Sequence, residues 1–272
     1  SAGSADGAAG SATFNYPLGV ALTSDGAHLY VVGYVGHKIR KVATVNGQVT
    51  TLAGSGSAGS ADGAAGSATF NRPTGLALTS DNSVLYVAEE QNHKIRMVLT
   101  STGAVSTLAG DGNAGHDDGA AASASFNLPY GLALTSSDDV LYVGLHHSIR
   151  MIRSALPPPS PPPPFAPRLG AMRLGGSSVA VLVSTLAGGG ATSGSTDATG
   201  TSARFNSCRR MVLTPDNAIM YVSDFSNNKI RKVVVASGVV TTLAGGGSAG
   251  SADGAAGSAT FSGPYDVALT AD

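Results

Sequence analysis

A motif that begins with phenylalanine recurs along this chain at a spacing of 56 residues. Its first two copies are Phe14-Asn-Tyr-Pro-Leu-Gly and Phe70-Asn-Arg-Pro-Thr-Gly, and the third begins at Phe126. The fourth copy begins at Phe205, 79 residues later, because the third repeat carries an insertion, and the fifth begins at Phe261. A period of this size indicates stacked supersecondary units, none of which can bury its apolar faces alone. The chain is therefore expected to form one continuous array.

Each repeat contains four short apolar segments separated by turn residues. In the second repeat these segments are residues 75–79, 84–88, 93–99 and 104–109. Their length and their content of β-branched and aromatic residues predict strands, and the clusters between them predict tight turns. Four strands joined in sequence make an antiparallel meander. Meanders in tandem predict an all-β β-propeller with one four-stranded blade per repeat.

The repeat boundaries divide the chain into four complete blades and part of a fifth. We assign residues 1–13 to an inter-blade linker, 14–69 to blade 1, 70–125 to blade 2, 126–204 to blade 3, 205–260 to blade 4 and 261–272 to the first strand of a further blade. Residues 1–14, 57–70 and 248–261 are identical and are built mostly from Gly, Ala and Ser. Small residues allow close backbone approach, so these linkers are expected to lie flat across the blade edges.

A second motif begins the third strand of each repeat. Blade 2 has Asn92-His-Lys-Ile-Arg96, and the variants in the other blades are His37-Lys-Ile-Arg40, His147-Ser-Ile-Arg150 and Asn228-Lys-Ile-Arg231. Together with Phe-Asn-x-Pro-x-Gly and a closing Thr-Leu-Ala-Gly, these motifs resemble the NHL repeat. The resemblance implies a propeller, usually of six blades. It also implies a family that includes protein- and RNA-binding scaffolds and a related propeller lyase that uses a metal.

Four blades and one further strand do not close a six-bladed ring. We therefore expect the chain to be a segment of a longer polypeptide, cut within near-identical repeats. The alternative is a ring or spiral completed by a neighbouring molecule, because an unpaired first strand leaves exposed edges.

The composition argues against several classes of function. Only 12% of the residues are charged and the net charge is −1, which gives no electrostatic case for binding nucleic acid or an anionic membrane. No apolar run is long enough for membrane insertion. The single cysteine, Cys208, excludes an intrachain disulfide. No nucleophile–base motif or phosphate loop is found, so neither enzyme activity nor a cofactor is expected.

Arginine and aspartate recur with the same period as the repeat. The arginines of the second motif are Arg40, Arg96, Arg150 and Arg231, and the linker aspartates are Asp6, Asp62, Asp118, Asp197 and Asp253. Because equal periods allow the same contact in every blade, we expect structural ion pairs that hold the linkers down and fix the register of the blades. Calcium binding is disfavoured, since one carboxylate per loop supplies too few oxygen ligands.

Three histidines, His37, His93 and His147, stand at the start of the third strand in three blades. A metal needs convergent ligands about 2.1 Å from one ion, whereas symmetry-related side chains on separate blades point apart. We therefore interpret these histidines as structural and expect no metal site.

The fourth repeat departs from the motif where its first strand begins. Cys208 and Arg210 replace the usual proline and glycine, and Asp266 replaces that glycine in the fifth repeat. In a propeller this position opens the rim of the central channel, where ligands usually bind. The candidate contact residues on this rim are Arg209, Arg210, Asp266, Tyr16, Arg72 and Tyr130. The alternative is a salt bridge between Arg210 and Asp266 on adjacent blades.

Blade 3 carries an insertion, residues 154–178, between its third and fourth strands. At its centre stand Pro157, Pro158, Pro159, Ser160, Pro161, Pro162, Pro163 and Pro164. Such a segment forms polyproline II, extends about 25 Å at ~3.1 Å per residue, and projects from the blade because proline cannot donate ladder hydrogen bonds. It is a stiff spacer, a docking peptide for an aromatic groove, or a glycan carrier. The last interpretation follows from its resemblance to hydroxyproline-rich cell-wall glycoproteins of plants and green algae.

Together these features favour a non-enzymatic structural or interaction propeller, an extracellular or cell-surface glycoprotein of a coat, wall or fibre. Such a protein would contact other protein subunits, self-associate into an assembly and carry covalent glycans. One alternative is an intracellular, cytoplasmic scaffold of NHL repeats that binds protein. The other is a segment of a propeller lyase whose catalytic groups lie in other blades.

Overall fold

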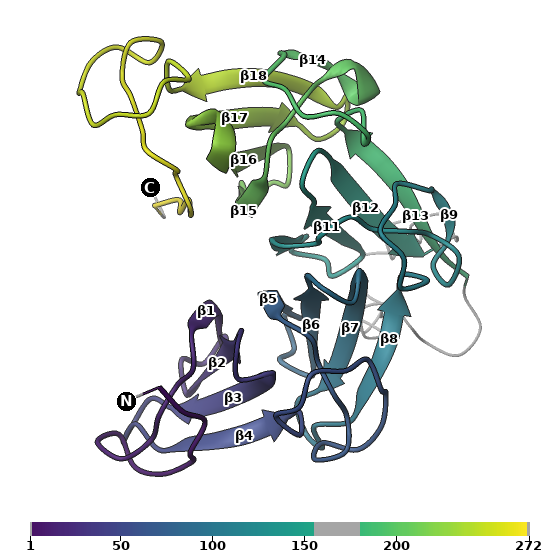
Figure 1. Cartoon of the computed structure of the whole chain (residues 1–272), viewed down its shortest axis with the longest axis vertical. Coiled ribbons are helices and arrows are strands. Elements are labelled where there is room, and N and C mark those ends of the chain that lie inside the picture. The colour runs from purple at the N-terminus through teal and green to yellow at the C-terminus, as the bar shows by residue number, and fades with distance from the viewer. Residues whose placement is uncertain (1, 155–179, 271–272) are drawn as a thin grey trace, which may run out of the picture.

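The computed structural model describes residues 2–154 and 180–270, which form four antiparallel β-sheets (Figure 1). Blade 1 contains β1 (Pro17–Leu22), β2 (His28–Gly33), β3 (Lys38–Ala43) and β4 (Val49–Ala53). Blade 2 contains β5 (Pro73–Leu78), β6 (Val84–Glu89), β7 (Lys94–Leu99) and β8 (Val105–Ala109). Blade 3 contains β10 (Leu132–Leu134), β11 (Val140–Gly144), β12 (Ile149–Ser154) and β13 (Val181–Ala187). Blade 4 contains β15 (Cys208–Leu213), β16 (Ile219–Asp224), β17 (Lys229–Val234) and β18 (Val239–Ala244), and the short 3₁₀ turns are η1 (Gly200–Ser202) and η2 (Phe225–Asn227).

Each blade is a meander in which a strand pairs with the next strand of the chain. The first strand of each blade lies nearest a common centre and the fourth lies at the outside (Figure 1). The four blades curve around this centre and leave the curve open between β1 and the C-terminal segment (Figure 1). This arrangement confirms the prediction of an all-β propeller built from four-stranded blades.

The hydrophobic core lies at the junctions between blades. At the first junction Tyr30, Val32 and Ile39 of blade 1 pack with Phe70, Leu85 and Val87 of blade 2. The recurring phenylalanine is fully buried where it lies between two described blades, as at Phe70, Phe126 and Phe205. Burying a side chain of this size contributes about 1.5–3 kcal/mol relative to leaving it exposed. Because both faces of a blade are covered at such junctions, the strands read as nearly continuous apolar runs.

The turn between the first and second strands links each blade to the one before it. Its left-handed residues, with φ between 58° and 70°, are Gly26, Asn82, Asp138 and Asn217. Gly, Asn and Asp adopt this conformation most readily. Asn82 Oδ1 accepts a hydrogen bond from Ser24 N of blade 1, at 3.0 Å. Asp138 accepts in the same way from Ser80, and Asn217 from Ser136.

The linker adds an outer partner to the blade that follows it. β9 (Gly119–Ala120) pairs with β13, and β14 (Ala198–Thr199) pairs with β18. Isolated bridges join Gly7 to Val49 and Gly63 to Val105 in the first two blades. The sequence did not predict this pairing, because Gly and Ala have low strand propensity. The pairing covers part of an outer edge that would otherwise present free backbone groups.

The sequence also predicts two segments beyond the strands of the four blades: the C-terminal residues and the insertion in blade 3. Residues 265–270, which the sequence predicts as a first strand, form no strand. A strand needs a neighbour to complete its ladder, and in the described residues no strand pairs with this segment. The insertion follows β12 and precedes β13, and positions 157–164 lie outside the described residues. Within the described ranges, no helix has the length and hydropathy required to span a membrane.

Candidate functional site: the inner rim

A buried arginine on the third strand of each blade is ion-paired with the preceding linker. Arg40 Nη2 lies 2.7 Å from Asp6 Oδ1, and Arg96 Nη2 lies 2.6 Å from Asp62 Oδ1. The corresponding distances are 2.5 Å for Arg150 and Asp118 and 2.7 Å for Arg231 and Asp197. The arginine side chains are at most 2% exposed, whereas the four aspartates are 44–49% exposed. In the described part of the chain, Asp253 makes no such pair.

Hydrogen bonds extend each ion pair into a small network. In blade 2, Arg96 also donates to the carbonyl oxygens of Ala61 and Thr69, at 3.0 and 3.2 Å. Asp62 accepts hydrogen bonds from the backbone N–H and the hydroxyl of Thr107 on β8, both at 3.1 Å. The linker is thereby fixed to the third and fourth strands of the blade that it enters. These contacts fix register, which is the role that half-buried ion pairs fill best.

Blades 2 and 4 add a second carboxylate that the sequence analysis did not assign to the arginines. Glu89 Oε2 lies 2.7 Å from Arg96 Nη1, and Asp224 Oδ2 lies 2.7 Å from Arg231 Nη1, with both acidic side chains fully buried. Burial raises the pKa of Glu89 and of Asp224, and the neighbouring arginine opposes that rise. An acidic residue at the end of the second strand was the available signal, since blade 1 has Gly33 at the same place.

The histidines of the second motif connect neighbouring blades. His37 Nδ1 accepts a hydrogen bond from the backbone N–H of Arg72 in blade 2, at 3.3 Å. His93 Nδ1 does the same with Leu128 of blade 3, also at 3.3 Å. In blade 3, where the turn is one residue shorter, His147 Nδ1 lies 3.2 Å from the carbonyl oxygen of Gly190 instead. Among the described residues, no group of three or more His, Cys, Asp and Glu is arranged to hold a metal ion.

Residues that differ from repeat to repeat gather on the inner rim. They follow the second strand or flank the proline that begins the first strand. The rim band, as we name it, consists of Tyr16, Tyr34, Arg72, Glu90, Tyr130, His146, Arg209, Phe225 and Tyr265. The rings of Tyr16 and Tyr34 lie 5.7 Å apart, and the Arg72 guanidinium lies 5.6 Å from the Tyr34 ring centre. The structure thus brings the predicted rim residues Tyr16 and Arg72 together through Tyr34, which the sequence analysis missed.

Arg209 is held among three aromatic rings from three different repeats. Its guanidinium carbon lies 4.1 Å from the ring centre of Tyr130, 5.0 Å from that of Phe225 and 5.9 Å from that of Tyr265. Distances below about 6 Å allow cation–π attraction. The hydroxyl groups of Tyr130 and Tyr265 are also hydrogen-bonded to each other. Two predicted rim residues, Tyr130 and Arg209, therefore form one preorganised cluster.

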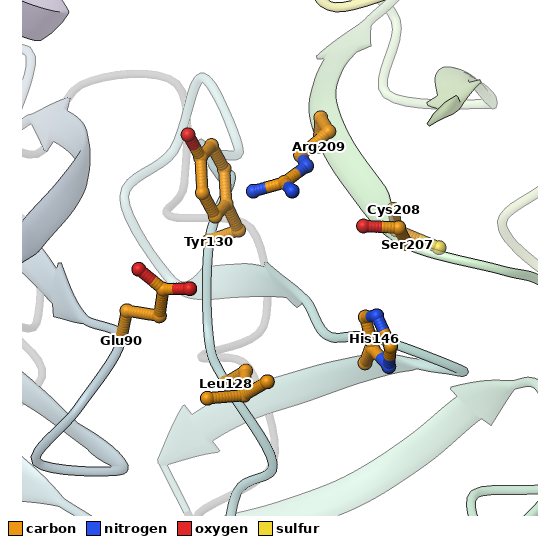
Figure 2. Close-up of a pocket in the computed structure, with 7 residues that line it drawn as sticks. All are labelled: Glu90, Leu128, Tyr130, His146, Ser207, Cys208 and Arg209. Atoms are coloured by element: carbon orange, nitrogen blue, oxygen red, sulfur yellow. The ribbon is translucent and has the colours of Figure 1, made fainter. Parts of the chain in front are cut away.

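A small pocket lies on the rim band between Glu90 and Arg209. It has a volume of about 50 Å³ and is lined by Glu90, Leu128, Tyr130, His146, Ser207, Cys208 and Arg209 (Figure 2). Figure 2 shows the Arg209 guanidinium directed toward the ring of Tyr130. Glu90 Oε2 accepts a hydrogen bond of 2.5 Å from the hydroxyl of Tyr34. Burial, together with this bond, raises the pKa of Tyr34 to about 12, and burial lowers the pKa of His146.

Arg210 occupies a position at which the earlier blades require glycine. A Cβ atom at Gly75 or Gly131 would fall on a backbone carbonyl oxygen of the next blade. In blade 4 the hydroxyl of Ser223 links β15 to the C-terminal segment. It accepts a hydrogen bond from Arg210 N at 2.9 Å and donates one to the carbonyl oxygen of Tyr265 at 3.0 Å. Asp266 is exposed, and in the described part of the chain it forms no ion pair with Arg210. The salt bridge considered from sequence is therefore not seen.

Comparison with known proteins supports the resemblance to NHL repeats. No protein-family model matches the chain. NHL repeat-containing protein 2 of Bos taurus is 32% identical over 153 residues, which are 52% of this chain and 21% of that protein. The Homo sapiens protein of the same name is 36% identical over 107 residues, covering 39% of this chain and 15% of its own length. The chain thus matches about a fifth or less of the length of these two relatives.

A solved structure shares the fold. An auxiliary nutrient binding protein from Bacteroides ovatus superposes with a TM-score of 0.63 over 93% of this chain and 53% of its own, with 16% sequence identity. At this level of identity the likeness concerns the fold alone. The chain is accordingly a β-propeller by its architecture, with repeats that are similar to NHL repeats.

Proposed function

We propose that this chain is a non-enzymatic interaction scaffold that binds another protein at the rim band. The supporting observation is the contrast between constant and variable positions in its repeats. Three linker copies are identical, and the buried arginine recurs in all four blades. The rim positions, by comparison, hold Tyr34, Glu90, His146 and Phe225 at one site of the repeat. A fold built from copies needs no such variation, whereas recognition of an asymmetric partner requires the repeats to differ at the contact positions.

The chemistry of the rim band fits protein recognition. Tyrosine and arginine are the residues most enriched among energetically dominant interface positions. Tyr16 is 63% exposed, and Tyr265 is 36% exposed, so aromatic surface remains accessible at both ends of the band. The aromatic neighbours of Arg209 restrict its side chain, which lowers the conformational entropy lost when a partner binds.

Selection from a random peptide-display library tests this function. The intact chain should enrich peptides whose binding is lost in a variant with Tyr16→Ala and Arg72→Ala, since both residues are exposed members of the band. The matched control is Val45→Ala, which alters a residue that is 89% exposed in the turn between β3 and β4. Peptides that bind wild type and the rim variant equally would contradict the proposal.

For the setting of this function, the proposal extends to an extracellular or cell-surface coat, wall or fibre glycoprotein. The identical linkers and the proline-rich segment at positions 157–164 support it, because both are typical of repetitive extracellular proteins. Mass spectrometry of the glycopeptides that span residues 156–165 is the test. Hydroxyproline with attached glycans is expected, and unmodified proline throughout would leave the intracellular scaffold as the better interpretation.

A further inference from the structure

We propose that Arg209 and Arg210 form a binding site for the carboxylate side chains of an acidic peptide segment in the partner protein. This inference rests on the proposed function and names the chemistry of the partner. It is carried by three observations: the charge balance of these two arginines, the way Arg209 is held, and the place that Arg210 reaches.

The charge balance separates Arg209 and Arg210 from the arginines on the third strands. Each of those four arginines has an aspartate within ion-pairing distance, and two of them have a second carboxylate. In residues 2–154 and 180–270, no carboxylate forms an ion pair with Arg209 or Arg210. Both side chains are partly buried. Two adjacent, partly desolvated positive charges without an ion-pair partner favour a ligand that supplies one.

The aromatic rings hold Arg209 in a binding geometry. A guanidinium held against aromatic rings can offer its N–H groups to a carboxylate in a bidentate manner. The ring of Tyr130, at 4.1 Å, and that of Phe225, at 5.0 Å, fix the group before any ligand arrives. The pocket beside it, about 50 Å³, suits a small group such as a carboxylate.

Arg210 extends the site toward the centre of the blades. Its Nη2 atom lies 2.9 Å from the point where a Cβ atom of Gly19 would stand, so a side chain from blade 4 reaches the first strand of blade 1. Arg209 and Arg210 lie at an irregularity in the pairing of β15 with β16, and their guanidinium groups reach different neighbours, the ring of Tyr130 and the first strand of blade 1. Two carboxylates on one extended peptide could therefore engage one arginine each.

The acidic residues near the site decide which anion it prefers. Glu90 lines the same pocket as Arg209, and its carboxylate is bound by the hydroxyl of Tyr34 at 2.5 Å. A negative wall disfavours a dianion such as phosphate more than a single carboxylate. Burial lowers the pKa of Arg210, and the charge of the nearby exposed acid Asp266 partly opposes this lowering. Asp266 thus competes with an incoming carboxylate.

Fluorescence polarisation tests the inference with three labelled peptides, in which tyrosine alternates with glutamate, glutamine or lysine. The glutamate peptide should bind about tenfold more tightly than the glutamine peptide, and added salt should reduce the difference. Arg209→Gln and Arg210→Gln should each weaken its binding about tenfold. Arg209→Lys should fall between wild type and Arg209→Gln, because lysine keeps the charge but not the planar fork.

Matched variants keep the result interpretable. Lys41→Gln removes the same charge from β3, outside the rim band, and should change binding less than about twofold. Asp266→Asn should tighten the binding of the glutamate peptide, since it removes the competing acid. Circular dichroism establishes that each variant is folded before its affinity is compared.

The outcomes separate this inference from the proposed function. Equal binding of the glutamate and glutamine peptides, or wild-type affinity in both arginine-to-glutamine variants, would overturn the acidic-peptide site. If a neutral or basic peptide binds and Tyr16→Ala abolishes that binding, the scaffold function stands and the acidic partner is wrong. If neither these peptides nor the display library gives rim-dependent binding, both proposals fail.

Discussion

The Nδ1 atom of His93 in blade 2 accepts a hydrogen bond of 3.3 Å from the backbone N–H of Leu128 in blade 3. Asn228 takes the equivalent place in blade 4, and its Oδ1 atom accepts from Gly263 N at 2.9 Å. Both acceptors have left-handed backbone, with φ of 54° at His93 and 53° at Asn228. Histidine and asparagine adopt this region more readily than most residues. The position three residues before the arginine of the second motif is thus one acceptor site at a blade junction.

Exchange of residues at this acceptor site should follow the hydrogen bond. His93→Asn should leave the free energy of unfolding within about 0.5 kcal/mol of wild type, because asparagine fills the same place in blade 4. His93→Leu should lower it by about 1–3 kcal/mol, since the N–H of Leu128 loses its partner. Urea unfolding followed by circular dichroism measures both values. Equal stability of the leucine and asparagine variants would show that the bond is unimportant.

The same hydrogen bonds should make the blade junctions sensitive to acid. Burial lowers the pKa of His37 and of His93 from the usual 6.5, and Asp111 and Glu90 partly oppose the shift at His93. A depressed histidine pKa contributes stability that is complete above the unfolded-state value and is lost as pH falls through the folded-state pKa. Protonated Nδ1 also becomes a donor and no longer accepts.

Hydrogen exchange at single amides measures this effect. The protection factors of Arg72 N–H and Leu128 N–H should decrease as the pH is lowered from neutral into the acidic range. The protection of Gly263 N–H should not follow this decrease, because its acceptor is Asn228, which does not titrate. A double variant with His37→Asn and His93→Asn should lose the pH dependence. A parallel decrease at all three amides would argue for general acid unfolding instead.

The buried ion pairs should differ in cost according to the exposure of the partner acid. Arg96→Met leaves Glu89 fully buried without its cation and should destabilise the chain by about 3–5 kcal/mol. Arg40→Met leaves only Asp6, which is 48% exposed, and should cost less. Adding Glu89→Leu to Arg96→Met should recover part of the loss, because the unpaired charge is gone. Chemical unfolding of the three variants gives the order, and a larger loss for Arg40→Met would contradict it.

The close approach of neighbouring blades should make one glycine irreplaceable. A Cβ atom at Gly75 would fall on the carbonyl oxygen of Tyr130, so Gly75→Ala must separate blades 2 and 3. We expect a loss of about 1–3 kcal/mol in the free energy of unfolding, as for other overpacked sites. The control is Gly66→Ala, since nothing lies within 4 Å of a Cβ at Gly66. Similar melting temperatures for the two variants would show that the junction yields easily.

The repeats explain why much of the fold was predictable. The fixed period and the four apolar segments of each copy led directly to four-stranded blades, which the sheet order confirms. A repeat buries its apolar faces on its neighbours in the same way each time, so the local pattern carries the architecture. The outer pairing of the linkers was missed, because β9 and β14 are only two residues long and depend on an available sheet edge.

The candidate site was predictable only in part. Sequence analysis selected Arg209 and Tyr130 from their departure from the repeat or their place beside the proline. It could not show that the Arg209 guanidinium lies 4.1 Å from the ring of Tyr130 or that Tyr34 binds Glu90. These contacts join residues of different repeats, and the spacing within one repeat contains no information about them.

The sequence by itself determined the blade, its strands and the recurrence of arginine and aspartate, because these depend on local pattern and on symmetry between copies. Tertiary structure decided which side chains meet at the centre. There the copies differ, so each contact depends on the curvature of the array and on which variant residue the next blade presents. An unpaired Arg209 among Tyr130, Phe225 and Tyr265 arises only when three repeats are brought around one rim.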